Sequence, residues 1–98
     1  MKYYVCKLLP PRPSFPQDMT PREAEIMQAH VAYCRQLLDS GKALVFGPVA
    51  DPEGVWGLGV LQLPDDADPQ TIIAADPVMK AEAGFVYRVL PMLQAATR

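Results

Sequence analysis

The 98-residue sequence has no run of lysine and arginine, and its formal net charge is −2. Nucleic acids and anionic membrane surfaces are bound through clusters of basic side chains, so the sequence predicts neither as a partner. No stretch approaches the ~20 apolar residues that a membrane-spanning helix needs, and the N-terminus has no signal-peptide pattern. We therefore expect a cytoplasmic protein.

The sequence also has few of the residues and motifs that bind metals and nucleotides. It contains one histidine and two cysteines, Cys6 and Cys34, which do not form a Cys-x-x-Cys pair. Zinc and iron sites draw on several such ligands, so no metal site is predicted. No glycine-rich loop follows a strand, because Gly57 and Gly59 lie inside one. We expect no cofactor and two buried reduced thiols, with a disulfide or redox pair as the alternative.

Hydrophobic periodicity predicts four strands and two helices. Runs rich in β-formers predict strands over residues 3–9, 43–46, 55–63 and 85–90. Helices are predicted over residues 21–40 and 69–75, each opened by a capping residue followed by proline. Prolines predict an irregular loop over residues 10–18, and residues 91–98 have a modest helical tendency.

Local signals bound the two helices. Thr20 and Glu23 form a capping-box pattern at the start of the first helix, and Gly41 is expected to stop it. Asp68 precedes a proline at the start of the second helix. Asp76 is expected to end that helix, because it precedes Pro77 and a residue before proline avoids the helical region.

The order β-α-β-β-α-β predicts one α+β domain spanning residues 1–98. In the ferredoxin-like arrangement of this order, a four-stranded antiparallel sheet carries both helices on one face. The strands are apolar on both faces, so the face without helices needs a cover. A second copy of the chain is the expected cover, since most soluble oligomers are symmetric, and we expect a homodimer.

The single histidine, His30, falls near the middle of the apolar stripe of the first helix. A titratable ring that points at the core needs a partner or an opening to solvent. His30 is therefore either a core histidine with a structural hydrogen bond or a general acid or base, a role that suits imidazole. Asp76 is either a carboxylate in a turn or the group that meets His30 and fixes its tautomer.

Several short motifs, in this order, resemble the YCII-related (YciI-like) family over nearly the whole chain. They are Phe15-Pro-Gln-Asp-Met-Thr20, Glu23, Met27, His30-Val-Ala-Tyr33, Gly41, Phe46-Gly-Pro-Val-Ala-Asp-Pro52, Ala75-Asp76-Pro77, Gly84-Phe-Val-Tyr87 and Leu90-Pro-Met92. The resemblance implies a dimeric α+β barrel, in which two ferredoxin-like sheets face each other. It also implies an active site built from a histidine and an aspartate, which fall on His30 and Asp76. One branch of the family is a dehydrochlorinase of a chlorinated hydroxyhydroquinone, a label that we do not transfer.

Together these observations predict a cofactor-independent enzyme that acts on a small organic molecule by lyase, isomerase or dehydrochlorinase chemistry. His30 would move the proton and Asp76 would orient it. The alternative is a non-catalytic small-molecule-binding or accessory module of the same fold. Glu23, Gly47 and Pro48 are further candidates for ligand binding, with helix capping and a strand-ending turn as their alternatives.

Two other groups of residues have weaker claims. A thiolate at Cys34, one helical turn from His30, is an alternative nucleophile. The aromatic residues are candidates for stacking on a ligand, against a default of core or interface packing. They are Tyr33, Trp56, Phe85 and Tyr87.

Overall fold

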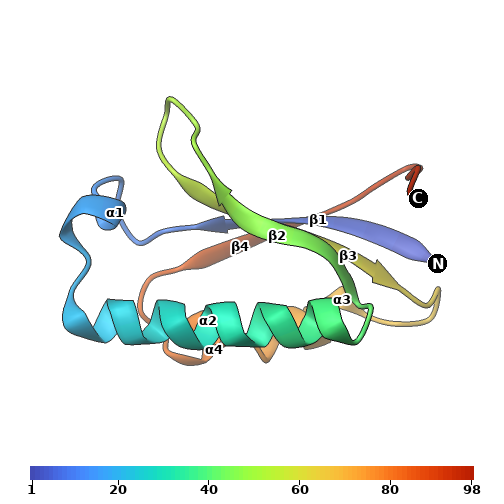
Figure 1. The fold of residues 1–98 in the computed structure, drawn as a ribbon, viewed down its shortest axis with the longest axis horizontal. Helices are drawn as coiled ribbons and strands as arrows, with labels where there is room; N and C mark the ends of the chain where they lie inside the picture. Colours follow the sequence, from blue (N-terminus) through green and yellow to red (C-terminus); the bar gives the residue numbers. More distant parts are fainter.

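The computed structural model describes residues 1–98 as four strands and four helices. The strands are β1 (Lys2–Leu9), β2 (Ala43–Val49), β3 (Trp56–Leu63) and β4 (Val86–Pro91), and the helices are α1 (Phe15–Asp18), α2 (Pro21–Asp39), α3 (Pro69–Ala74) and α4 (Pro77–Lys80). Neighbouring strands are antiparallel, in the order β2-β3-β1-β4. Helices α2, α3 and α4 lie on one side of this sheet (Figure 1). The predicted α+β class and four-stranded antiparallel sheet are confirmed.

Helix α2 begins and ends where its sequence signals predict. The Thr20 hydroxyl accepts a hydrogen bond from the amide of Glu23 at 3.1 Å, and the Glu23 carboxylate accepts one from the amide of Thr20 at 2.9 Å. At the other end Gly41 has a φ of 78°, a left-handed conformation that glycine adopts without the strain of a Cβ. These reciprocal caps fix the position of every residue on the helix, including His30.

Strand β2 is longer than predicted, because it continues through Gly47 and Pro48 to Val49. The prediction that it ends at Phe46 is therefore wrong. Strand β2 is at the edge of the sheet, where the missing N–H of a proline need not cost a ladder hydrogen bond.

The proline-rich segment after β1 is also not wholly irregular. Helix α1 occupies one turn of it, with Pro16 in the first turn, where a proline removes no helical hydrogen bond. Residues 92–98 form no helix, in contrast to their modest helical tendency.

The predicted second helix forms as α3, and a further short helix, α4, follows it. Asp76-Pro77 ends α3 as expected and, in addition, opens α4, which the sequence analysis did not assign. Each helix starts with an aspartate followed by a proline. The Asp68 carboxylate accepts from the amide of Gln70 at 2.9 Å, and the Asp76 carboxylate accepts from the amide of Val78 at 3.0 Å. This second cap places the Asp76 carboxylate at the start of a helix.

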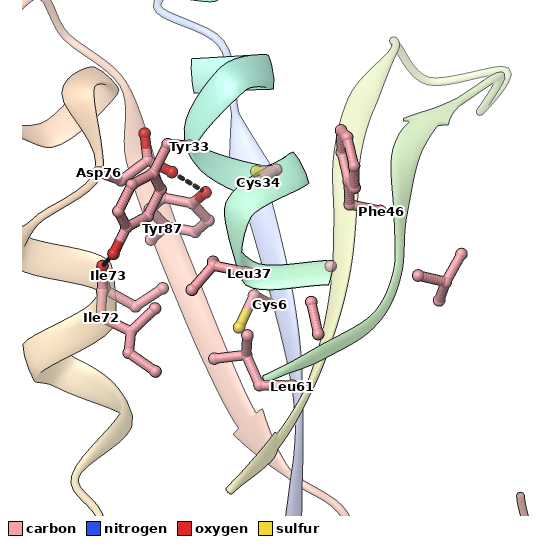
Figure 2. Close-up of a pocket in the computed structure, with 13 residues that line it drawn as sticks. Cys6, Tyr33, Cys34, Leu37, Phe46, Leu61, Ile72, Ile73, Asp76 and Tyr87 are labelled. Atoms are coloured by element: carbon pink, nitrogen blue, oxygen red, sulfur yellow. Dashed lines mark hydrogen bonds between the residues drawn. The ribbon is translucent and has the colours of Figure 1, made fainter. Parts of the chain in front are cut away.

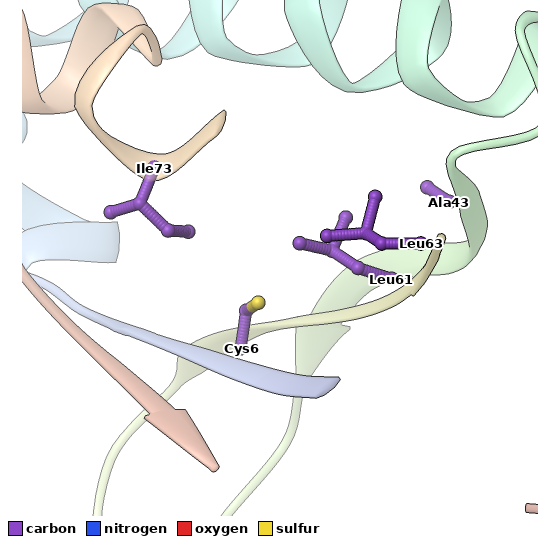
Figure 3. Close-up of a cluster of buried hydrophobic side chains, with 5 residues drawn as sticks. All are labelled: Cys6, Ala43, Leu61, Leu63 and Ile73. Carbon is purple, nitrogen blue, oxygen red and sulfur yellow. The ribbon is translucent and has the colours of Figure 1, made fainter. Parts of the chain in front are cut away.

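Two clusters of buried side chains fill the space between the helices and the sheet. The first combines Cys6, Ala43, Leu61, Leu63 and Ile73 (Figure 3). The second combines Leu8, Phe15, Val78 and Phe85. Gly57 lies opposite Leu8, and a Cβ added there would lie 3.3 Å from the Leu8 Cβ, so the strands pack closely at this glycine. Both cysteines are buried and free, as expected.

The other face of the sheet has no helix over it. Its residues alternate with those of the core, and Val5 pairs with Val60 on one side and Leu90 on the other. The side chains of Val86 and Leu90 are 52% and 54% exposed, so an apolar surface faces away from the helices. None of the helices is long and apolar enough to cross a membrane.

Candidate functional site

His30 and Asp76 meet where α2 packs against α4. The Nδ1 atom of His30 lies 3.0 Å from Oδ1 of Asp76 and 2.9 Å from Oδ2. Both residues are buried, with 8% and 2% of their surfaces exposed. The contact expected from the sequence is therefore present, in the core of the domain and away from bulk water.

The Asp76 carboxylate receives three hydrogen-bond donors. Its Oδ1 accepts from the amide of Val78 at 3.0 Å, and its Oδ2 accepts from the hydroxyl of Tyr87 at 2.7 Å. The third donor is His30 Nδ1, because an ionised carboxylate only accepts and the facing nitrogen must carry a hydrogen. This hydrogen-bond pattern assigns the Nδ1–H tautomer to neutral His30 and leaves Nε2 as the nitrogen that exchanges its proton.

The pair changes the titration of the imidazole. Burial alone would lower the pKa of His30, but the hydrogen bond to Asp76, the contact with Cys34 and the negative charge of Asp76 outweigh it and raise the pKa to about 9. His30 is therefore mostly imidazolium at neutral pH. In that state it can donate a proton, and it can accept one only as the pH approaches 9.

The thiol of Cys34 lies beside the imidazole ring. Its Sγ is 3.8 Å from Nδ1 of His30 and 3.7 Å from Nε2. A hydrogen bond in line with one ring nitrogen would leave the other nitrogen much farther away, so the near-equal distances indicate packing against the ring. This geometry does not favour a thiolate–imidazolium nucleophile.

His30, Cys34 and Asp76 also offer three metal-ligating atoms that lie within 4.8 Å of one another. Two ligand atoms on one tetrahedral zinc ion lie about 3.3 Å apart, given zinc–ligand distances of about 2.0 Å. The Nδ1 atom instead faces both Asp76 oxygens at 2.9 and 3.0 Å, which are hydrogen-bond distances. The arrangement thus fits a hydrogen-bonded acid–base pair better than a metal centre.

A cavity of about 30 Å³ adjoins the pair on the Asp76 side (Figure 2). Its walls are mostly apolar and come from α2, α3 and the sheet. Tyr33, Asp76 and Tyr87 are among its lining residues, whereas His30 is not. A cavity of this size has room for about one water molecule. An organic ligand therefore requires the surrounding side chains to move before it reaches the pair.

The other candidates for ligand binding lie away from this pair. Glu23 precedes His30 by seven residues, which is roughly 10 Å along a helix at about 1.5 Å per residue. Both of its carboxylate oxygens accept from the guanidinium of Arg12, each at 2.8 Å. Gly47 and Pro48 pair with β3 and do not line the cavity. The structure does not bring these three residues to His30.

The sequence analysis missed the side-chain hydrogen-bond donors of two candidate site residues: Tyr87, which binds Asp76, and Arg12, which binds Glu23. Tyr87 was considered only for stacking, and its hydroxyl instead binds Asp76. The alternation of β4 was an available signal, because it puts Tyr87 on the same face as Val89, which packs against the core. Arg12, which also binds Asp18 at 2.8 Å, lies in a proline-rich segment without periodicity and had no such signal.

Comparison with known protein families places the chain. The YCII-related domain matches residues 3–93 of the 98. The chain belongs to the YCII-related family. A search of the curated proteins found no match. The resemblance seen in the short motifs is thus confirmed, and the matched YCII-related domain contains His30, Asp76 and Tyr87.

Proposed function

We propose that this YCII-related domain is a cofactor-independent acid–base enzyme in which His30 transfers a proton and Asp76 holds its ring. The observation that carries the proposal is the buried contact of 2.9 Å between the imidazole and the carboxylate. A buried ion pair adds little net stability compared with apolar side chains, because desolvation offsets the attraction. A catalytic role better explains why this pair lies in the core of a small domain, since titratable groups with perturbed pKa values cluster at functional sites.

The direction of proton transfer follows from the charge state. At neutral pH the imidazolium donates the Nε2 proton to a leaving group or to a carbanionic carbon of the substrate, and Asp76 stabilises the charged ring beforehand. Isomerases that return a proton to carbon and lyases that protonate a leaving group contain such a step. Dehydrochlorination instead transfers a C–H proton to a base and releases chloride, so it requires the neutral form of His30, which is populated as the pH approaches 9. General acid catalysis of this kind contributes roughly 10²–10⁴-fold to a rate.

The function is tested with a panel of small carbonyl compounds and halogenated phenols. Proton exchange with D₂O and halide release are followed by NMR and ion chromatography. We expect a compound that the protein converts and that His30→Gln converts about 10²–10⁴-fold more slowly. Cys34→Ala should retain activity, which separates the acid–base role from a thiol nucleophile. Equal conversion by the protein and by His30→Gln would contradict the proposal.

A second candidate function is non-catalytic binding of a small molecule. It is favoured by one observation, that the apolar cavity is lined by Asp76 and not by His30. In that case a ligand from the panel binds without conversion, and His30→Gln changes its affinity without changing its chemical state. Isothermal titration together with NMR of the recovered ligand distinguishes the two functions.

The proposed functional unit is a homodimer of ferredoxin-like domains with facing sheets. The strand order, the helices on one face and the exposed side chains of Val86 and Leu90 support it. Sedimentation at micromolar concentration should give twice the mass of the chain. Leu90→Lys, which puts a charge on the apolar face, should give the monomer mass. A monomer before any substitution would contradict the homodimer.

A further inference from the structure

We propose that Tyr87 is a positioning residue, whose hydroxyl fixes the Asp76 carboxylate so that the carboxylate holds the His30 ring in one orientation. Its hydroxyl lies 2.7 Å from Oδ2 of Asp76, and Figure 2 shows the two side chains meeting at the cavity. The catalytic consequence rests on the proposed function, whereas the positioning itself can be measured without any substrate.

Two donors from different parts of the fold set the plane of the carboxylate. The amide of Val78 binds Oδ1 as part of the α4 cap, and the hydroxyl of Tyr87 comes from β4 and binds Oδ2. The last torsion of an aspartate side chain is soft, so one donor alone leaves the carboxylate free to rotate. With both donors in place, the two oxygens stand nearly equally distant from Nδ1 of His30, at 3.0 and 2.9 Å.

The Tyr87 hydroxyl is the donor in its contact with Asp76. Burial and the negative charge of Asp76 raise the pKa of Tyr87 above its usual value, so the phenol stays protonated. A hydroxyl that donates to an ionised oxygen forms one of the stronger hydrogen bonds in proteins, and 2.7 Å is typical of it. It also competes with the imidazolium for the charge of the carboxylate.

The chain contains a matched control in Tyr33. This residue lines the same cavity, and its hydroxyl also donates a hydrogen bond of 2.7 Å. The acceptor, however, is the backbone carbonyl of Ile72 and not Asp76 (Figure 2). Tyr33→Phe and Tyr87→Phe therefore remove the same atom from hydrogen bonds of the same length, and only Tyr87→Phe frees an oxygen of Asp76.

The experiment is an NMR titration of His30, whose ring signals are unambiguous because it is the only histidine. Tyr87→Phe should raise the titration midpoint by about half to one pH unit, since the carboxylate no longer shares its charge with a second side-chain donor. Tyr33→Phe should leave it near that of the unmodified chain. Equal midpoints in the two variants would overturn the proposal.

A second measurement keeps the test decisive if Tyr87→Phe does not fold. Replacing the tyrosines with 3-fluorotyrosine makes the phenol a stronger donor without deleting it. The His30 midpoint should then fall, and an unchanged or raised midpoint would overturn the proposal. Neither titration depends on activity. If the midpoints move as expected while His30→Gln retains full activity, the positioning stands and the proposed function fails.

Discussion

Helix α2 carries two charged clusters, and they differ in their access to water. At its N-terminus, Arg12 bridges Glu23 and Asp18 at distances of 2.8 Å, and the Arg12 side chain is 34% exposed. In its middle, His30 meets Asp76 at 2.9 Å, with side chains only 10% and 3% exposed. Both clusters consist of short, oriented hydrogen bonds between opposite charges. They differ in the exposure of the partner groups, because the side chains of Arg12 and Asp18 are 34% and 51% exposed, whereas Glu23, at 12%, is about as buried as His30.

The difference shows in how each cluster titrates. The hydrogen bonds from Arg12 and from the backbone of Thr20 lower the pKa of Glu23 to about 2, so this carboxylate stays charged over the whole physiological range. The His30 pKa is instead raised from 6.5 to about 9, so the imidazole is charged at neutral pH and loses its proton only in the alkaline range. The outer cluster therefore keeps its charge between α1 and α2 down to strongly acid pH, whereas the inner one loses its charge as the pH approaches 9.

The largest effect is expected for Asp76→Ala. This change leaves a buried imidazolium without its counter-charge and removes the α4 cap, so the free energy of unfolding should fall by about 3–5 kcal/mol. Asp68→Ala is the matched control, because Asp68 caps α3 in the same Asp-Pro context and is exposed. It should lose only about 1 kcal/mol. Equal losses in urea denaturation would show that Asp76 acts as a cap alone.

A second prediction concerns pH. The folded-state pKa of His30 lies above the unfolded value of 6.5, so the pair contributes stability that is fully present below pH 6.5 and is lost as the pH rises toward 9. The loss should be about 3 kcal/mol, from roughly 1.4 kcal/mol for each pKa unit. His30→Gln should show no such loss between pH 6 and 9. For Glu23 the window lies at acid pH, where stability is lost as the pH falls from 4.5 toward 2.

These clusters could be predicted from the sequence where their interactions join residues close together in the chain. The bounds of α2 were predictable because Thr20, Glu23 and Gly41 act on their own neighbours. The inward direction of His30 followed from helical periodicity. Its contact with Asp76 was also expected, since the inferred fold places the two helices together and the family resemblance implies the pair. The bounds of α2, the direction of His30 and its contact with Asp76 could thus be predicted from local patterns and family motifs.

The parts that were missed depend on distant contacts or on very short elements. Helix α4 has four residues, too few for periodicity, and the proline that opens it was interpreted only as the end of α3. The alternation of β4 indicates that Tyr87 faces the core, but the hydrogen bond of its hydroxyl to Asp76 joins residues of different elements, which no spacing in the sequence encodes. Arg12 is fixed by a turn in the proline-rich segment, whose path depends on tertiary packing.

The smallest effect is expected at the outer cluster. Arg12→Met keeps the side-chain stem near Phe15 and removes the charge, so it should lower stability much less than Asp76→Ala does. The difference between the unmodified chain and Arg12→Met should nearly vanish in 1 M NaCl, where the Debye length is about 3 Å. The loss caused by Asp76→Ala should persist at that salt concentration, because ions do not reach a buried pair. A salt-independent loss in Arg12→Met would mean that Arg12 is as shielded as His30, and the contrast between the two clusters would no longer hold.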